Sequence, residues 1–313
     1  MTDDKRGIED AIARLERASG NNAGKSLVTY RHKPSELNTN YTYSNEILTS
    51  AWLPRRLGKK DQEVFTRKFG GLTFITSTGR NEDLSPIGLP SGSIARKLFI
   101  SLIDKSFRTQ SPVVEFQSCY ALLRDVGLTI QTNNRRKVHD QFKRLSTCRI
   151  EIYFRLPDRP DRALRWQGSM FDFAEMYEVD SGLQTTLIPS KVIFSESFFK
   201  HVIQRSGFGY LSSLIKKTKS PLEIDILLWL VRRVAFTNDG VRVPVSQLKM
   251  QFGSSSMANY DFTRWFEPTF KTIADMLEIN EFEWDDDALW MPPLRNDQKK
   301  KHFRYNPLLT LAD

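Results

Sequence analysis

The sequence has few cysteines, few histidines and no long apolar run. Cys119 and Cys148 are the only cysteines among 313 residues, and each lies among apolar neighbours, so we expect packed thiols and no disulfide. The 4 histidines are far apart and form no His-x-His or His-Glu-x-x-His pair, which gives no support for a metal site. The longest apolar runs, such as 226–231, are far shorter than the ~20 residues that span a bilayer, and the N-terminus has no apolar signal core. We therefore expect a cytoplasmic protein that binds neither a membrane nor a metal.

Positive charge, by contrast, is in excess. Lysine and arginine number 46 against 37 aspartates and glutamates, which gives a formal net charge of +9. Apolar residues make up 40% of the chain and include 21 phenylalanines, enough to build folded cores. The length corresponds to about two domains of ~150 residues. A polyanion is the first partner to consider for such a protein.

Composition and turn residues divide the chain into four parts. Residues 1–40 are polar with little to bury, which predicts a flexible tail, and residues 295–313 form a basic C-terminal tail. Between the tails we place a first domain at 41–180, which includes an N-terminal extension. Residues 181–294 then hold a linker strand near 183–188, an apolar helix near 198–203 and a second domain.

The first domain has an informative order of elements. The hydrophobic pattern predicts a helix at 93–107, a strand at 113–116, helices at 118–126 and 134–146, and a hairpin of 148–156 with a strand that begins at 163. Ser93 is the expected N-cap of the first helix, and Gly127 should end the second.

The same order recurs in the second domain. Its elements are a helix at 221–234, a strand at 241–243, helices at 245–252 and 257–277, and a hairpin at 281–291. In the last helix we expect Trp265 to face inward with Phe262 and Phe266, and Pro268 to kink or split the helix. Helix, strand, helix, helix and hairpin is the order of a winged helix, a variant of the helix-turn-helix. The predicted fold is α+β, with two tandem winged-helix domains whose wings are small β-hairpins.

The third helix of a helix-turn-helix enters the major groove of DNA, so its polar face supplies the candidate contacts. In the first domain these are the basic residues of the third helix and of the wing: Arg135, Arg136, Lys137, Lys143, Arg144, Arg159, Arg162 and Arg165. In the second domain they are the residues at the start and on the polar side of its third helix: Ser254, Ser255, Ser256, Asn259, Thr263, Arg264 and Lys271. The first set is suited to phosphates and the second, a mixture of amide, hydroxyl and cation, to base edges. An ordinary solvated face remains the alternative for either helix.

The second wing is acidic. Near a phosphate backbone its carboxylates would be repelled, so this hairpin should point away from DNA or contact a protein: Glu281, Glu283, Asp285, Asp286 and Asp287. The three adjacent aspartates also suggest a metal nuclease, but without a second acidic cluster or a histidine a polar turn is the better interpretation. The sequence shows no Ser/His/Asp or Cys/His arrangement of the kind used in nucleophilic catalysis. We therefore expect no enzymatic activity, no catalytic residue and no cofactor.

Several segments, in this order, resemble the RepA-type plasmid replication initiators. They span residues 88–96, 108–112, 142–148, 192–199, 220–230 and 245–253, and the likeness extends from about Leu53 to Pro292. The resemblance implies tandem winged helices that bind repeated sites, called iterons, in a plasmid origin and help to open the adjacent AT-rich duplex. It implies recruitment of the host initiator and helicase, a homodimer in equilibrium with a monomer, and repression of the protein's own gene, with a role in plasmid copy control. It also implies a bacterial protein of the cytoplasm that is associated with the nucleoid or a plasmid.

The sequence also departs from this family. Pro268 interrupts the second recognition helix, and the turn at 129–134 has asparagine where relatives often have glycine. A double-winged-helix transcription regulator is the alternative function; it would bind duplex DNA as an initiator does, but would neither melt DNA nor load a helicase. A rolling-circle nuclease would need a His-hydrophobic-His metal site, which the scattered histidines do not provide.

Overall fold

The structure is a computed structural model that describes residues 40–44, 52–56, 62–69, 72–116, 119–125, 127–128, 132–156, 159–175, 190–204, 208–235, 239–253, 256–285 and 287–305. The predicted N-terminal tail, apart from Asn40, and the predicted linker strand at 183–188 lie outside these residues.

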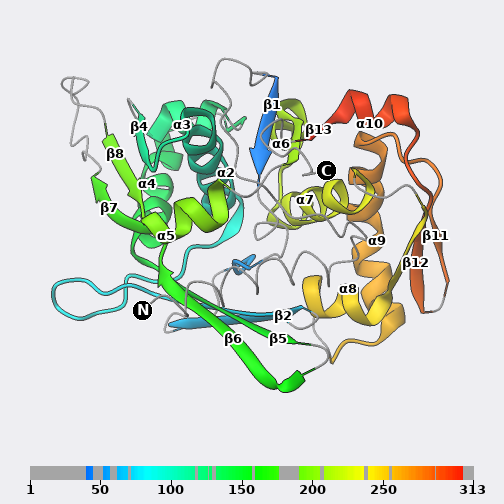
Figure 1. The fold of residues 1–313 in the computed structure, drawn as a ribbon, viewed down its shortest axis with the longest axis horizontal. Coiled ribbons are helices and arrows are strands. Elements are labelled where there is room, and N and C mark those ends of the chain that lie inside the picture. The colour runs from blue at the N-terminus through cyan, green and yellow to red at the C-terminus, as the bar shows by residue number, and fades with distance from the viewer. Residues whose placement is uncertain are drawn as a thin grey trace.

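The chain folds as a mixture of helices and small antiparallel sheets, which confirms the predicted α+β class (Figure 1). The first half contains β1 (Tyr41–Ser44), β2 (Val64–Phe69), β3 (Leu72–Ser77), α2 (Gly92–Thr109), β4 (Val113–Phe116), α3 (Cys119–Asp125), α4 (Thr132–Thr147), β5 (Arg149–Leu156), β6 (Arg159–Ser169) and β7 (Phe171–Glu175). The second half contains β8 (Ser190–Phe194), α5 (Glu196–Phe198), a π-helical turn (Phe199–Ile203), β9 (Phe208–Leu211), α6 (Ser212–Lys217), α7 (Pro221–Ala235), β10 (Val241–Pro244), α8 (Val245–Phe252), α9 (Asn259–Met276), β11 (Glu283–Trp284), β12 (Ala288–Met291), α10 (Asn296–His302) and β13 (Phe303–Tyr305). Within the described part of the chain, no helix combines the length and the apolar character needed to cross a bilayer.

The predicted order of elements occurs twice. It appears as α2, β4, α3, α4 and β5–β6, and again as α7, β10, α8, α9 and β11–β12. We call residues 52–175 the first module and residues 221–291 the second module. The apolar helix predicted near 198–203, between the two, is also present as α5 and the π-helical turn.

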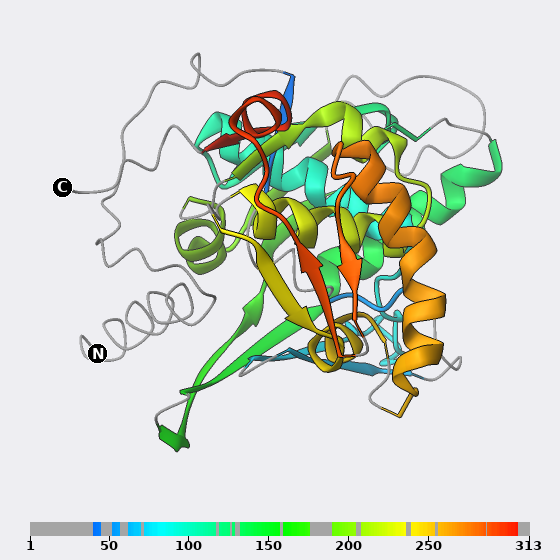
Figure 2. The same cartoon turned by 90° about the vertical axis from the view of Figure 1, so that its right-hand side faces the viewer.

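The two modules differ in how their strands pair. In the second module β10 joins its own hairpin, in the order β10-β12-β11. In the first module β4 pairs instead with β8, in the order β4-β8-β7, while the hairpin β5–β6 belongs to the sheet β2-β3-β5-β6. This hairpin projects from the rest of the molecule (Figure 2).

Helix α2 buries its predicted apolar stripe, with Leu98 and Leu102 fully inaccessible to solvent. Its N-cap is Ser91 and not the predicted Ser93. The backbone N–H of Ser91 donates to Oε1 of Gln141 in α4 at 2.8 Å, and this tertiary contact sets the start of the helix. The prediction of a packed thiol is confirmed for Cys148, which is buried and free; burial raises the pKa of its thiol to about 12.

Helix α9 corrects two predictions. It continues through Pro268, which lies on the exposed side, so the proline does not split it. The helix is held on its other side by fully buried aromatic rings: the Phe262 and Phe266 centroids are 5.1 Å apart, and the Phe266 and Phe270 centroids 6.0 Å apart. Trp265 does not face inward with them, because it is 40% exposed.

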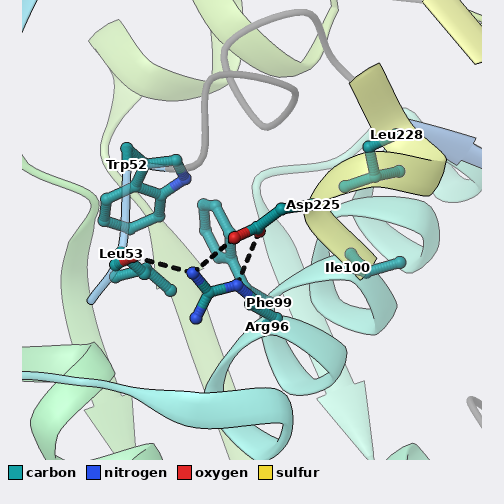
Figure 3. Close-up of a pocket in the computed structure, with 7 residues that line it drawn as sticks. All are labelled: Trp52, Leu53, Arg96, Phe99, Ile100, Asp225 and Leu228. Atoms are coloured by element: carbon teal, nitrogen blue, oxygen red, sulfur yellow. Dashed lines mark hydrogen bonds and ion pairs between the residues drawn. The ribbon is translucent and has the colours of Figure 1, made fainter. Parts of the chain in front are cut away.

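A buried ion pair joins the two modules. Arg96 of α2 donates from Nε and Nη2 to the two carboxylate oxygens of Asp225 in α7, at 2.7 and 2.9 Å (Figure 3). The remaining N–H groups of Arg96 donate to the carbonyl oxygens of Leu53 at 2.7 Å, Pro54 at 3.0 Å and Gly92 at 3.1 Å. The Arg96 and Asp225 side chains are only 5% and 3% exposed. The contact fixes α2, α7 and the segment 53–54 relative to one another.

Residues 296–305 belong to the folded body, although the sequence placed them in a basic tail. They form α10 and β13, and β13 pairs with β9, which in turn pairs with β1. Gln298 of α10 is buried and donates from Nε2 to the carbonyl oxygen of Glu278 at 2.6 Å. The sheet β1-β9-β13 thus brings together strands from three distant parts of the sequence.

We predict that Asp225→Asn lowers the free energy of unfolding by about 3–5 kcal/mol, because the Arg96 guanidinium would stay buried without a counter-charge. Urea denaturation followed by circular dichroism measures this loss. Glu63→Gln is the matched control: Glu63 pairs with Arg80 at the surface, with side chains 40% and 51% exposed, so its loss should be below about 1 kcal/mol. Equal losses for the two variants would contradict the prediction.

Candidate nucleic-acid interface

Helix α4, the third helix of the first module, presents a basic face to solvent. Its apolar side is buried through Val138, Phe142 and Leu145. The predicted contacts Arg136, Lys137 and Lys143 are exposed on the opposite side. Arg135 belongs to the helix, but its side chain lies outside the described residues. The geometry allows the exposed cations to meet a polyanion without any rearrangement of the helix core.

Arg144 differs from its neighbour Lys143 because other parts of the protein already hold it. Its guanidinium pairs with Asp140 one turn earlier, with Nε 2.8 Å from the carboxylate, and its side chain is only 18% exposed. It also lies so close against the backbone of Gly88 that a Cβ atom at this position would collide with Nη1. Arg144 thus anchors α4 to the turn that precedes α2.

The first wing carries the remaining basic candidates. Arg165 of β6 is exposed and donates from Nη2 to Glu151 of β5 at 2.7 Å, while its guanidinium lies 5.2 Å from the centroid of the Tyr153 ring. This contact from Arg165 is the first cause that lowers the pKa of Glu151 below its ordinary value. The side chains of Arg159 and Arg162 lie outside the described residues.

On α9, the third helix of the second module, the solvent side forms a shallow hollow. Its lining repeats at helical spacing: Tyr260, Thr263, Arg264, Glu267, Pro268 and Lys271. Three of these residues, Thr263, Arg264 and Lys271, are predicted contacts. Tyr260 was not among the candidates, although it is 73% exposed. Its position four residues before Arg264, on the same side of the helix, was the signal that would have found it.

The start of α9 holds the other candidates of the second module. Asn259 is exposed and accepts a hydrogen bond through Oδ1 from Nζ of Lys249 in α8 at 3.0 Å. Ser256 is exposed, whereas Ser254 and Ser255 lie outside the described residues. The Asn259 amide nitrogen keeps its donor capacity while its oxygen is occupied by α8.

One carboxylate of the acidic second wing, that of Asp285, is held by hydrogen bonds within the second module. Oδ1 of Asp285 accepts the backbone N–H groups of Asp287 at 2.9 Å and Ala288 at 2.6 Å, and Oδ2 accepts Arg242 Nη2 at 2.6 Å. These contacts, the backbone bond to Asp287 first, lower the pKa of Asp285. Asp285 therefore acts as a turn residue. Over the described residues, no group of three or more histidine, cysteine, aspartate or glutamate side chains is arranged to hold a metal ion.

The structure does not bring all of the candidates to one place. Helices α4 and α9 lie toward opposite ends of the longest axis of the molecule (Figure 1). The exposed residues of α4 and those of α9 thus form two separate surfaces, one on each module. A ligand that used both would have to extend along the molecule.

Two solved structures are similar to this chain in fold. A crystal structure of domains 2–3 of RctB, a replication initiator of Vibrio chromosome II, covers 81% of this chain and 98% of its own, with a TM-score of 0.51 and 10% sequence identity. Selenomethionine-labelled domains 2 and 3 of RctB cover 79% and 99%, with a TM-score of 0.50 and 8% identity. The fold is similar to that of a replication initiator. At these identities the similarity concerns the fold alone. No family model matches the chain, and no curated protein matches its sequence.

We predict that Arg144→Ala lowers the free energy of unfolding by about 1 kcal/mol, because it removes a partly screened ion pair and the packing over Gly88. Lys143→Ala is the adjacent control and should stay within about 0.5 kcal/mol of the parent protein. Thermal and urea denaturation of both variants measure the difference. An Arg144→Ala protein as stable as Lys143→Ala would show that the guanidinium does not anchor α4.

Proposed function

We propose that this protein is a DNA replication initiator that binds duplex DNA through two winged-helix modules. The observation that carries the proposal is the pair of exposed third helices, α4 and α9, on a fold similar to that of RctB domains 2–3. In each module the third helix comes directly after the second in the order of helices, which is the position of the recognition helix in a helix-turn-helix. The three-stranded order β10-β12-β11 in the second module further supports the winged-helix assignment.

The charges of the two helices support different roles on DNA. The exposed Arg136, Lys137 and Lys143 of α4 suit phosphate oxygens, which bind cations without regard to sequence. The solvent side of α9 offers the hydroxyl of Thr263 and the guanidinium of Arg264, groups that hydrogen-bond to base edges in the major groove. We therefore assign backbone binding mainly to the first module and base recognition mainly to the second.

The finer parts of the proposal rest on the resemblance to RepA-type initiators. On this basis the DNA sites are iterons of a plasmid origin, binding helps to open an AT-rich segment, and the host initiator and helicase are recruited. The same resemblance supports a monomer–dimer equilibrium and repression of the protein's own gene. The protein acts as a binding protein and not as an enzyme, with no cofactor, in the bacterial cytoplasm.

The decisive experiment is a footprint on the DNA that flanks the protein's own gene, combined with permanganate probing of unpaired thymines. We expect protection of tandem direct repeats and reactive thymines in a neighbouring AT-rich segment. Protection of a single palindrome without reactive thymines would indicate a transcription regulator instead. If no segment is protected, the proposed function is wrong.

We predict that two sets of variants separate backbone binding from base recognition. Arg136→Ala combined with Lys137→Ala should weaken binding to every duplex and reduce the slope of log affinity against log salt by about 1 for each phosphate that the protein no longer neutralises. Arg264→Ala should relax base preference at particular positions by about 1–3 kcal/mol. Arg80→Ala is the control, because this exposed arginine lies outside both third helices and pairs with Glu63. Fluorescence anisotropy at several salt concentrations measures the DNA affinity of these three variants. If the α4 double variant and Arg264→Ala both lose the same affinity on every DNA sequence, the assignment of backbone binding to α4 and of base recognition to α9 is wrong.

A further inference from the structure

One flank of α9 carries an aromatic ring that an arginine of the first module covers. The Cζ atom of Arg55, in the segment 52–56, lies 4.8 Å from the centroid of the Trp265 ring. With a turn of about 100° per residue, Trp265 points about 100° away from Arg264, so it lies beside the solvent stripe of α9 and not on it. A guanidinium stacked on a tryptophan face is held by the charge distribution of the ring as well as by dispersion. This contact connects the first module to the flank of α9, next to the side that we propose reads bases.

A second arginine of the first module reaches the turn that precedes α9. Arg67 of β2 donates from Nη1 to the carbonyl oxygen of Gly253 at 3.2 Å. Gly253 is the C-cap residue that follows α8, so this hydrogen bond holds the point at which the chain leaves α8 toward α9. The Arg67 guanidinium also lies 5.2 Å from the centroid of the Phe65 ring in its own strand. Arg55 and Arg67 therefore hold α9 at its flank and just before its start.

These two arginines are poorly compensated within the protein. Nη1 of Arg55 and Nε of Arg67 are buried and have no hydrogen-bond partner among the described residues. Burial is the first cause that lowers the pKa of Arg55 to about 10; the carboxylate of Asp225 acts against it, and the neighbouring Arg67 and Arg96 lower the pKa further. A buried N–H group without a partner is unfavourable, so these two N–H groups do not stabilise the fold. What both side chains do gain is a contact with the second module.

The position of Arg55 is itself fixed by the ion pair that joins the modules. Arg96 is hydrogen-bonded to the carbonyl oxygens of Leu53 and Pro54, the two residues that precede Arg55. The same guanidinium binds both carboxylate oxygens of Asp225. A continuous set of contacts thus leads from α7, through Arg96 and the segment 53–55, to the flank of α9.

We propose that Arg55 and Arg67 of the first module are positioning residues that set the orientation of α9 on DNA, so that base recognition by the second module depends on the first. This inference rests on the proposed function. The arginines act through Trp265 and the Gly253 turn and not by direct contact with DNA. A small rotation of α9 moves its side chains relative to base edges, and hydrogen bonds to bases weaken steeply with misalignment.

The test uses the full chain and a pool of DNA duplexes with a randomised central segment. Sequencing of the bound fraction gives the base preference of the parent protein, and the positions that Arg264→Ala relaxes define the part of the site read by α9. Arg55→Ala and Trp265→Ala should relax those same positions. Their affinity for the most enriched duplex should fall about three- to thirtyfold, the size of a cation–π contact between a cation and a tryptophan. Arg56→Ala, which removes the neighbouring exposed arginine, is the matched control and should leave the preference unchanged.

Three further measurements separate positioning from direct binding. If Arg55 acts through Trp265, the double variant should bind no more weakly than either single variant, and the salt slope should not change. Arg55→Lys keeps the charge but removes the planar stacking group, so it should restore only part of the affinity and of the base preference. A salt slope lower by about 1, additive decreases in affinity, or full rescue by lysine would overturn the proposal, since each result indicates a phosphate contact.

The proposal and the function on which it rests fail in different ways. If the parent protein enriches no sequence from the pool, the proposed function fails. If the parent protein enriches a sequence and Arg55→Ala enriches the same one with the same preference at every position, only the positioning role fails. Circular dichroism of each variant establishes that it is folded before binding is compared, and Arg67→Ala provides the same test at the Gly253 turn.

Discussion

The arrangement of this protein depends on the hydrogen bonds and the ion pair that the buried Arg96 guanidinium makes. This guanidinium has five N–H donors, and the structure supplies five acceptors: the two carboxylate oxygens of Asp225 and the carbonyl oxygens of Leu53, Pro54 and Gly92. A buried ion pair adds little stability compared with well-packed apolar side chains, because both groups must first be removed from water. It does, however, demand one geometry, since a shifted partner would leave a buried charge uncompensated. This requirement explains why α2, α7 and the segment 53–54 meet in a single way.

A fixed relation between the modules has consequences for any long ligand. Helices α4 and α9 lie toward opposite ends of the longest axis, and α2 and α7, which support them, are joined through Arg96 and Asp225. The contacts between the modules therefore fix the separation of the two third helices before any ligand binds. For a DNA-binding protein, such rigidity converts the spacing of two contact regions along a duplex into a requirement that the DNA must meet.

The sequence predicted the parts of the fold that arise from local patterns. Helices α2, α7 and α8 and strand β5 follow from apolar spacing over a few turns or residues, and the repeated order of elements follows from them. Pairings between distant segments were not predictable, as the β4–β8 pair and the sheet β1-β9-β13 show, because strand partners depend on the whole chain. The candidate site has the same limit. Lys143 and Arg144 are adjacent cations in the sequence, yet Asp140 and the backbone at Gly88 hold only the arginine, and the place of Trp265 beside Arg55 depends on residues about 200 positions apart.

The acidic wing of the second module constrains how α9 can approach DNA under the proposed function. Glu281, Glu283 and Asp285 are exposed, and only Asp285 is drawn into the turn by the backbone and Arg242. Carboxylates beside a phosphate backbone are repelled, so the wing and the backbone must lie apart while α9 enters the groove. In the first module the wing carries Arg165 and projects from the body, where a cation is attracted to the same backbone. The two wings thus carry charges of opposite sign. This favours a complex in which the first module contacts the duplex through both α4 and its wing, whereas the second module contacts it through α9 alone.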